Sequence, residues 1–300
     1  MKKKTYLFTL MAMALTLGSC SDNENGIGGE TSKYITVSTS IGNMTRVATD
    51  ANGGQTFEEG DEISVYAWIG APTVAPETSE RVVNNAINKL TNGSWVSTPQ
   101  MLWKNNRDKH YFIGVYPTAA ISDLSAGEYT FDVNKQTESD LLVAVNPDGL
   151  SYSADAQQTV PLTFTHVMAK LAVNLTYKNQ WGGIPTVEKV VVGNAAKEAT
   201  INYLTKVVTP STTAKEDFSL PEITENTKYV SVIIPQEDVK QLTIVIGGKN
   251  FVYDNGTPFK LESGKITTVN LEVGRDEIKL GDVKITNWED GSTFSGEALN

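Results

Sequence analysis

The sequence predicts an all-β protein, and three observations support this fold class. The chain of 300 residues contains 24 glycines and is rich in threonine and valine, whereas long helical patterns are few. Short apolar runs alternate with turn-forming residues along most of the chain. The longest alternation spans Leu162–Tyr177, where apolar residues recur at every second position, as in a strand with one buried face.

The apolar phase within Leu162–Tyr177 shifts by one residue at Thr165–His166. Apolar residues occupy even positions before the shift and odd positions after it. Such a shift indicates either a β-bulge or a point at which the chain passes from one sheet to another. We interpret the segment as the seam between two β-sandwich domains, predicted at 34–157 and 158–300.

Residues 1–19 have the pattern of a secretory signal, because three lysines precede an apolar run that is too short to span a bilayer stably. The last residues of this pattern, together with Cys20, resemble the lipobox of bacterial lipoproteins. The resemblance implies cleavage before Cys20 and attachment of several acyl chains, which anchor a protein firmly. The alternative is a simple signal peptide followed by an incidental cysteine.

Residues 20–33 are polar and glycine-rich, so we expect a flexible tether that is lipidated at Cys20. Its acidic residues resemble the surface-export signal of lipoproteins in some Gram-negative anaerobes. Because Cys20 is the only cysteine of the chain, no intramolecular disulfide can form. The folded domains must therefore be stabilised by their hydrophobic cores.

The first predicted domain begins with a strand at Tyr34–Ile41, which alternates cleanly between apolar and polar residues. The segment after it has few apolar residues and contains Arg46 and Val47, which we expect in an exposed loop. The carboxylates at 50–61 do not have the spacing of a calcium loop. The apolar face of the first strand consists of Ile35, Val37 and Ile41.

Further strands follow from alternation and turn residues. Arg81–Leu90 fits either a helix or a strand, but Asn92-Gly93 directly after it is a hairpin signal and favours a strand. The spacing of the strands in the second domain is typical of a β-sandwich. The other predicted strands are Ile63–Trp68, His110–Tyr116, Tyr129–Val133, Leu141–Val145, Val187–Val192, Ala199–Tyr203, Tyr229–Ile234, Leu242–Ile246, Phe251–Tyr253, Ile266–Val273 and Asp282–Trp288.

Charge and motifs argue against several functions. The net charge of −10 would repel a nucleic-acid backbone. The chain has only two histidines and no HExxH, GxSxG or Walker-type motif. We interpret His110 as structural, and likewise His166, whose ring can bond the backbone across a bulge. We therefore expect no catalytic residue, no cofactor and no metal site. The five tryptophans fit either core positions or a sugar platform.

With these pieces in place, the chain resembles the fimbrillin family, the subunits of type V pili, and most of all its Mfa-like lipoproteins. The resemblance runs in order along nearly the whole chain. The matching pieces are the lipobox and its tether, Thr45-Arg46, Phe57–Ile63, Val65-Tyr66, Asp140–Ala144, Leu162–Leu171, Ile233–Gln236, Ser263–Lys265 and Ile285–Trp288.

The resemblance implies two tandem transthyretin-like β-sandwich domains, no enzymatic activity, and a cell-surface position on the outer membrane. It also implies that pilus subunits are the partners, and that they assemble by β-strand exchange after an arginine-specific protease trims the N-terminus. Cleavage between Arg46 and Val47 would release the first strand. The family points to the C-terminal segment as the donor, whose apolar residues here are Val283, Ile285 and Trp288.

Two alternative functions stay open at this point. The chain could be a surface lipoprotein that binds a glycan or host ligand without polymerising, or it could be a pilus anchor. Arg46 separates these possibilities, because a polymerising subunit needs a cleavable site behind a removable strand. A monomeric binder has no such need.

Overall fold

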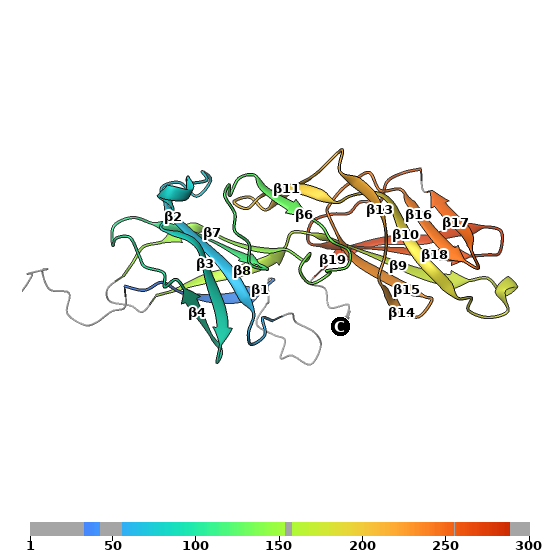
Figure 1. Ribbon diagram of the computed structural model, residues 1–300, viewed down its shortest axis with the longest axis horizontal. Coiled ribbons are helices and arrows are strands. Elements are labelled where there is room, and N and C mark those ends of the chain that lie inside the picture. Colours follow the sequence, from blue (N-terminus) through green and yellow to red (C-terminus); the bar gives the residue numbers. More distant parts are fainter. Residues whose placement is uncertain (1–32, 43–55, 154–157, 255, 289–300) are drawn as a thin grey trace, which may run out of the picture.

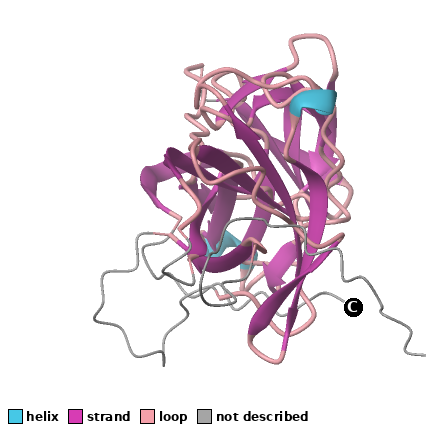
Figure 2. Ribbon diagram, turned by 90° about the vertical axis from the view of Figure 1, so that its left-hand side faces the viewer, coloured by secondary structure: helices cyan, strands magenta, loops and turns pink. Residues whose placement is uncertain are grey.

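The computed structural model describes residues 33–42, 56–153, 158–254 and 256–288, and its regular structure is almost entirely β-strand (Figure 1). Figure 2 shows strands and loops with only small helical pieces, which are the 3₁₀-helices Thr78–Glu80 and Asn179–Trp181. Within these ranges no helix is both long and apolar enough to cross a membrane. The prediction of an all-β fold is confirmed.

The first large sheet has seven strands in the order β1-β8-β7-β5-β2-β3-β4 and lies on the left of Figure 1. Most neighbouring strands pair antiparallel, but β1 and β8 run parallel. This pair brings the start of the described chain beside a segment more than a hundred residues later. The strands are β1 (Thr36–Ile41), β2 (Glu62–Ile69), β3 (Val83–Thr91), β4 (Ser94–Thr98), β5 (His110–Tyr116), β7 (Leu142–Leu150) and β8 (Thr159–His166).

Three further sheets follow, and most of their strands lie on the right of Figure 1. Their orders are β14-β15-β9-β18-β19, β13-β10-β16-β17 and β12-β11-β6. The strands are β6 (Gly127–Thr130), β9 (Ala169–Tyr177), β10 (Val187–Ala196), β11 (Glu198–Asn202), β12 (Val207–Pro210), β13 (Lys215–Ser219), β14 (Glu222–Thr224), β15 (Lys228–Ile233), β16 (Gln241–Ile246), β17 (Lys249–Asp254), β18 (Lys265–Val273) and β19 (Ile278–Asn287).

The chain changes sheets where its apolar phase shifts. β8 pairs within the seven-stranded sheet, whereas β9, which begins at Ala169, pairs with β15 and β18 in the five-stranded sheet. Of the two explanations for the shift, the passage between sheets is therefore confirmed. Strand pairing also crosses between the two halves of the chain, because β6 pairs with β11. The division into domains at 157/158 stays a prediction.

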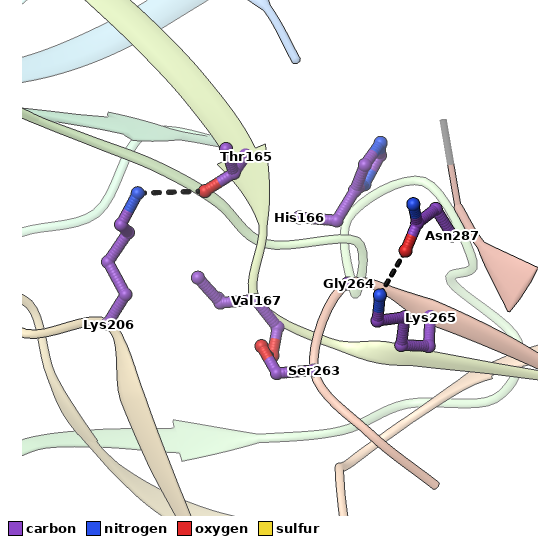
Figure 3. Close-up of a pocket in the computed structure, with 8 residues that line it drawn as sticks. All are labelled: Thr165, His166, Val167, Lys206, Ser263, Gly264, Lys265 and Asn287. Atoms are coloured by element: carbon purple, nitrogen blue, oxygen red, sulfur yellow. Dashed lines mark hydrogen bonds between the residues drawn. The ribbon is translucent and has the colours of Figure 1, made fainter. Parts of the chain in front are cut away.

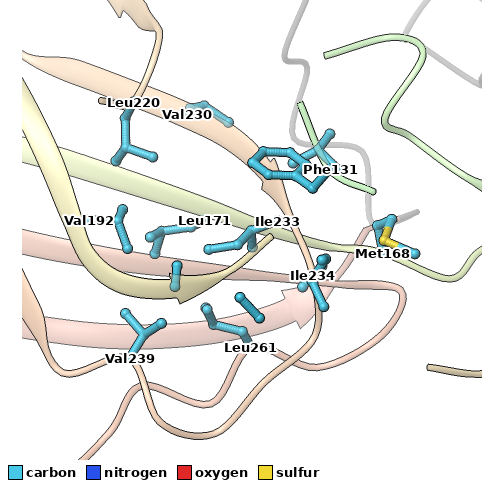
Figure 4. Close-up of a cluster of buried hydrophobic side chains, with 14 of the residues drawn as sticks. Phe131, Met168, Leu171, Val192, Leu220, Val230, Ile233, Ile234, Val239 and Leu261 are labelled. Carbon is cyan, nitrogen blue, oxygen red and sulfur yellow. The ribbon is translucent and has the colours of Figure 1, made fainter. Parts of the chain in front are cut away.

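The seven-stranded sheet is buried on both faces, because β2 places side chains in two hydrophobic clusters. Val65 belongs to the smaller cluster, which also contains the buried residues of β1. Tyr66 belongs to the larger cluster, which extends through the rest of the described chain and includes Leu171 (Figure 4). One continuous core therefore joins this sheet to the three that follow it.

Local turn chemistry explains the strand that the sequence left ambiguous. Residues 83–91 form β3, and the hairpin to β4 turns at Asn92 and Gly93, whose φ angles of 51° and 72° are both positive. Asparagine and glycine tolerate this left-handed geometry better than other residues, and it matches the twist of the two strands. The hairpin prediction is confirmed.

Candidate functional site: the two edge strands

β1 is one edge of the seven-stranded sheet, and among the described residues its only strand partner there is β8. The register runs from Thr36 opposite Thr159 to Ile41 opposite Phe164. Threonine and serine hydroxyls form side-chain hydrogen bonds across the pair, including a 3.2 Å bond from Ser40 Oγ to Thr163 Oγ1. The strand is thus attached by a backbone ladder and by exposed polar contacts.

The other side of β1 is partly closed by the segment that follows β4. The Ile35 amide donates to the Met101 carbonyl at 2.9 Å, and the Trp95 indole nitrogen donates to Thr39 Oγ1 at 3.0 Å. β1 therefore lies in a slot between β8 and residues 95–103. The core side of this slot is hydrophobic, because Met101 and Trp103 are buried in the same cluster as the apolar residues of β1.

The predicted apolar face of β1 does point into the core. Ile35 and Val37 are buried in the smaller hydrophobic cluster, and Ile41 packs against it as a half-buried residue. Burying side chains of this size contributes roughly 1.5–3 kcal/mol each before entropy is counted. The strand is held mainly by its apolar face, and its removal would expose that part of the cluster.

β19 is an edge of the five-stranded sheet and, within the part of the chain that the structure describes, pairs antiparallel with β18 alone. It begins at Ile278, earlier than the sequence predicted, and it is exposed from Lys279 to Asn287. A bulge at Gly281 keeps Leu280 on the same face as Val283 and Ile285, opposite the buried residues of β18. The exposed fractions of these three side chains are 37%, 37% and 41%.

Trp288, the third apolar residue of the predicted donor segment, has a different environment. Its side chain is only 7% exposed, and its ring stacks on the ring of His166 with centroids 4.0 Å apart and an interplanar angle of 5°. Lys170 Nζ lies 4.2 Å from the centre of the Trp288 ring. The Trp288 amide also donates to the Gly264 carbonyl at 3.0 Å. The C-terminal end of β19 is therefore fixed, although the strand itself is exposed.

His166 connects this end of β19 to the point where the chain changes sheets. Its Nδ1 lies 2.8 Å from Asp140 Oδ1, so the Nδ1 partner is a carboxylate and not the backbone group that the sequence suggested. Asp140 also acts on Lys170. Burial lowers the pKa of Lys170, and the Asp140 carboxylate raises it in part. His166, Trp288, Asp140 and Lys170 thus form one cluster, in which the two rings are buried and Asp140 and Lys170 are half-buried.

A cavity of about 370 Å³ opens beside this cluster (Figure 3). Lys206 Nζ donates to Thr165 Oγ1 at 3.0 Å, and Lys265 Nζ donates to Asn287 Oδ1. No carboxylate is among the lining residues that the structure describes. Sequence reasoning missed the site because four separate segments supply its lining, which consists of Thr165, His166, Val167, Lys206, Ser263, Gly264, Lys265 and Asn287.

His110 is buried beside the smaller cluster, where its ring lies 5.0 Å from that of Trp103. Its Nε2 accepts a hydrogen bond from the Lys104 amide at 3.1 Å, and its Nδ1 lies 3.1 Å from the Asp108 carbonyl. Burial lowers the pKa of the imidazole. This satisfied, neutral side chain agrees with the structural interpretation. Within the described ranges, no group of three or more potential metal ligands is close together.

The residues predicted for modification lie outside the described ranges. They are Cys20 for lipidation, and Arg46 and Val47 for proteolytic processing. The roles assigned to β1 and to Val283, Ile285 and Trp288 also stay predictions, although their placement is known. The structure does not bring the predicted first strand and the predicted donor strand together, because β1 and β19 lie at the edges of different sheets.

Comparison with solved structures shows a shared fold. A proposed cell adhesion protein from Bacteroides ovatus is 18% identical with a TM-score of 0.62, over 85% of this chain and 98% of that chain. One from Bacteroides uniformis is 17% identical with the same TM-score and coverage. The tip fimbrial protein Mfa3 from Porphyromonas gingivalis, with C-terminal truncation, is 12% identical with a TM-score of 0.50, over 77% and 95%.

Sequence comparison gives the family directly. No curated protein matches the chain. The model of the fimbrillin-like family, however, matches residues 45–288, which is well over half of the sequence. This match extends from the predicted processing site to Trp288 at the end of β19. The chain belongs to the fimbrillin-like family.

Proposed function

We propose that the chain is the lipid-anchored precursor of a structural or adhesive subunit of a type V pilus. In this proposal it has no enzymatic activity and assembles by strand exchange after proteolysis. The observation that carries the proposal is the position of β1 in this slot. It is an edge strand whose apolar face packs into the smaller hydrophobic cluster. Family membership supports the same conclusion.

Cleavage after Arg46 would leave β1 attached to its sheet only by non-covalent contacts. Its departure would expose Val160 and Phe164 of the core together with an unpaired edge on β8. An open edge of this kind is a template for a strand from another molecule. The vacated slot is thus the acceptor site of the proposal.

β19 is the proposed donor for this slot. It is exposed and has a single strand partner, and Val283 and Ile285 follow the same two-residue spacing as Ile35 and Val37. Because donor and acceptor are different surfaces of one chain, the contact is head-to-tail and can extend into a filament instead of closing into a dimer.

The anchor of the precursor is lipid on Cys20, which places the subunit on the cell outer membrane until it is processed. Acyl chains stabilise membrane attachment by roughly 0.8 kcal/mol for each buried CH₂ group. The wild-type protein should therefore partition into detergent. Cys20→Ala should remain unprocessed or become soluble, and a lipid-labelled, membrane-bound variant would contradict this part of the proposal.

The main experiment treats the lipid-free protein with an arginine-specific protease. We expect one early cut after Arg46, identified by mass spectrometry, followed by oligomers whose size increases with protein concentration. Arg46→Lys is the matched control, because it keeps the charge and removes the cleavage site. Deletion of 283–300 should allow cutting but abolish the oligomers.

Two outcomes would reject the proposal. If the cut protein stays monomeric, the chain is better explained as an anchor or as a surface lipoprotein that binds a glycan or host ligand. If the deletion variant polymerises as well as the full chain, β19 is not the donor.

A further inference from the structure

The inward face of residues 35–41 has one polar position. The apolar residues of this face pack into or against the smaller hydrophobic cluster, whereas Thr39, on the same face, is a half-buried hydroxyl. Its Oγ1 accepts the 3.0 Å hydrogen bond from the Trp95 indole nitrogen. The slot that holds β1 therefore fits a strand with apolar residues and a hydrogen-bond acceptor at one fixed place.

Trp95 is held in place by contacts that do not involve β1. Its ring makes an edge-to-face contact with Phe57 at a centroid distance of 5.3 Å, and Phe57 makes a similar contact with Phe164 at 5.1 Å. All three residues follow Arg46 in the sequence, so they stay with the main body of the protein after the proposed cleavage. The indole N–H can only donate, and these contacts keep it directed at the place of the acceptor.

A strand that fills the slot must satisfy this donor. With β1 absent, water can bond the indole nitrogen, but an incoming strand covers the nitrogen and displaces that water. An apolar side chain in the place of Thr39 would leave the N–H of Trp95 buried and unpaired, which costs the desolvation energy of that group. A site built around a hydrogen bond therefore discriminates against a ligand that lacks the partner atom.

β19 has an acceptor at the matching distance from its two apolar residues. Val283, Ile285 and Asn287 alternate along the strand and face the same side. If Val283 and Ile285 fill the two buried positions of β1, Asn287 takes the place of Thr39. In its own subunit Asn287 Oδ1 already accepts a hydrogen bond, from Lys265 Nζ (Figure 3).

Nearby placements of β19 do not satisfy the slot. A shift by one residue would turn Lys284 and Thr286 toward the core. A shift by two residues would place either Ile285 opposite the indole nitrogen or Asn287 in the hydrophobic cluster. Insertion in the opposite direction, with the acceptor opposite the indole nitrogen, would leave Val283 beyond the end of β1. The need for an acceptor thus favours one register and one direction.

We propose that Trp95 selects the register of strand exchange by binding Asn287 of a second copy of the chain. The incoming β19 runs in the direction of β1, with Val283 and Ile285 in the hydrophobic cluster and Asn287 Oδ1 accepting from the indole nitrogen. This inference rests on the proposed role of β19 as the donor strand, and it names the two atoms that set the position of that strand.

The test uses the lipid-free, protease-cut chain and a labelled synthetic peptide of residues 278–288, whose binding is measured by fluorescence anisotropy. Asn287→Leu in the peptide keeps a similar size but has no acceptor, and we expect it to weaken binding roughly tenfold. Asn287→Thr should bind like the original peptide, because it restores a hydroxyl acceptor. On a Trp95→Phe chain, which keeps an aromatic ring but lacks the N–H, the difference between the asparagine and leucine peptides should disappear.

Thr286→Val in the peptide is the matched control, since this residue faces outward in the proposed register, and it should bind like the original. Cross-linking reports the register itself. Thr36 Oγ1 lies 3.2 Å from Thr159 Oγ1, and Lys284 would take the place of Thr36. The lipid-free chain has Cys20→Ala for this measurement. Thr159→Cys should then form a disulfide with a Lys284→Cys peptide and much less with a Thr286→Cys peptide.

The inference is overturned if Asn287→Leu binds as tightly as the original peptide, if its weaker binding persists on the Trp95→Phe chain, or if the disulfide forms at Thr286. These results are distinct from a failure of the proposed function. If all the peptides bind equally well, β19 remains the donor and only the selection by Trp95 fails. If no peptide binds the cut chain, the donor role of β19 fails and this inference fails with it.

Discussion

At the residue scale, His110 shows how burial fixes a protonation state. Nε2 accepts a hydrogen bond from the Lys104 amide, so the ring proton must be on Nδ1, where it donates to the Asp108 carbonyl. A protonated ring would lose the first of these bonds and would place a charge in a buried site. The lowered pKa of His110 follows from this burial.

Because the pKa of His110 is lowered in the folded chain, we expect the stability of the protein to be sensitive to acid. The unfolded chain binds a proton at His110 near the ordinary pKa of 6.5, whereas the folded chain binds it only at lower pH. The free energy of unfolding should therefore fall as the pH decreases below about 6.5. Urea denaturation at pH 7.5, 6.5 and 5.5 measures this, and His110→Asn should flatten the dependence. An unchanged slope in the variant would show that other groups are responsible.

The sequence predicted burial better than it predicted partners. Ile35, Val37 and Leu171 were assigned to buried faces from alternation alone, and each is buried. The contact between His166 and Asp140 could not be predicted, because it joins residues 26 positions apart through the start of β7. Alternation indicates which way a side chain points, but not which distant segment lies opposite.

At the element scale, strands with strong alternation were predicted well. β5 matches its expected range, and β18 differs by one residue. β12, β13 and β14 were missed because they are short and mostly polar or exposed, so they have little apolar pattern. Both β1 and β19 were expected as strands. Their positions at sheet edges could not be predicted, because an edge is defined by a missing neighbour.

The two edge strands should respond differently to the same substitution. Val37→Lys places a charge in the smaller hydrophobic cluster, so the free energy of unfolding should fall by several kcal/mol. Val283→Lys is on an exposed strand and should change it by less than about 1 kcal/mol. Urea denaturation of the uncut protein measures both values. A larger loss for Val283→Lys would mean that β19 belongs to the stable core.

At the scale of the whole molecule, the halves of the chain are joined by more than a linker. β6 pairs with β11, and one hydrophobic cluster contains both Tyr66 and Ile201. The cavity depends on the same arrangement, because its lining residues come from both sides of the sheet change. Composition and alternation indicated the fold class and most of the strands, but this long-range assembly depends on contacts that a sequence pattern does not specify.

This continuity predicts cooperative unfolding. We expect one thermal transition in calorimetry, and the same midpoint from tryptophan fluorescence and circular dichroism. Ile201→Ala, in the strand that joins the two halves, should lower the midpoint for all probes together. Two separate transitions, with only one shifted by Ile201→Ala, would show that the halves unfold independently.

The parallel pair of β1 and β8 also determines when β1 can take its place. Thr36 pairs with Thr159, so the ladder closes over 123 residues of chain. During synthesis the N-terminal strand emerges first, yet its partner strand does not exist until β8 has followed and joined β7. Contacts between such distant segments form late, because the loop must close before they contribute. Every newly made chain should therefore pass through an intermediate in which β8 has an open edge, before β1 has paired with it.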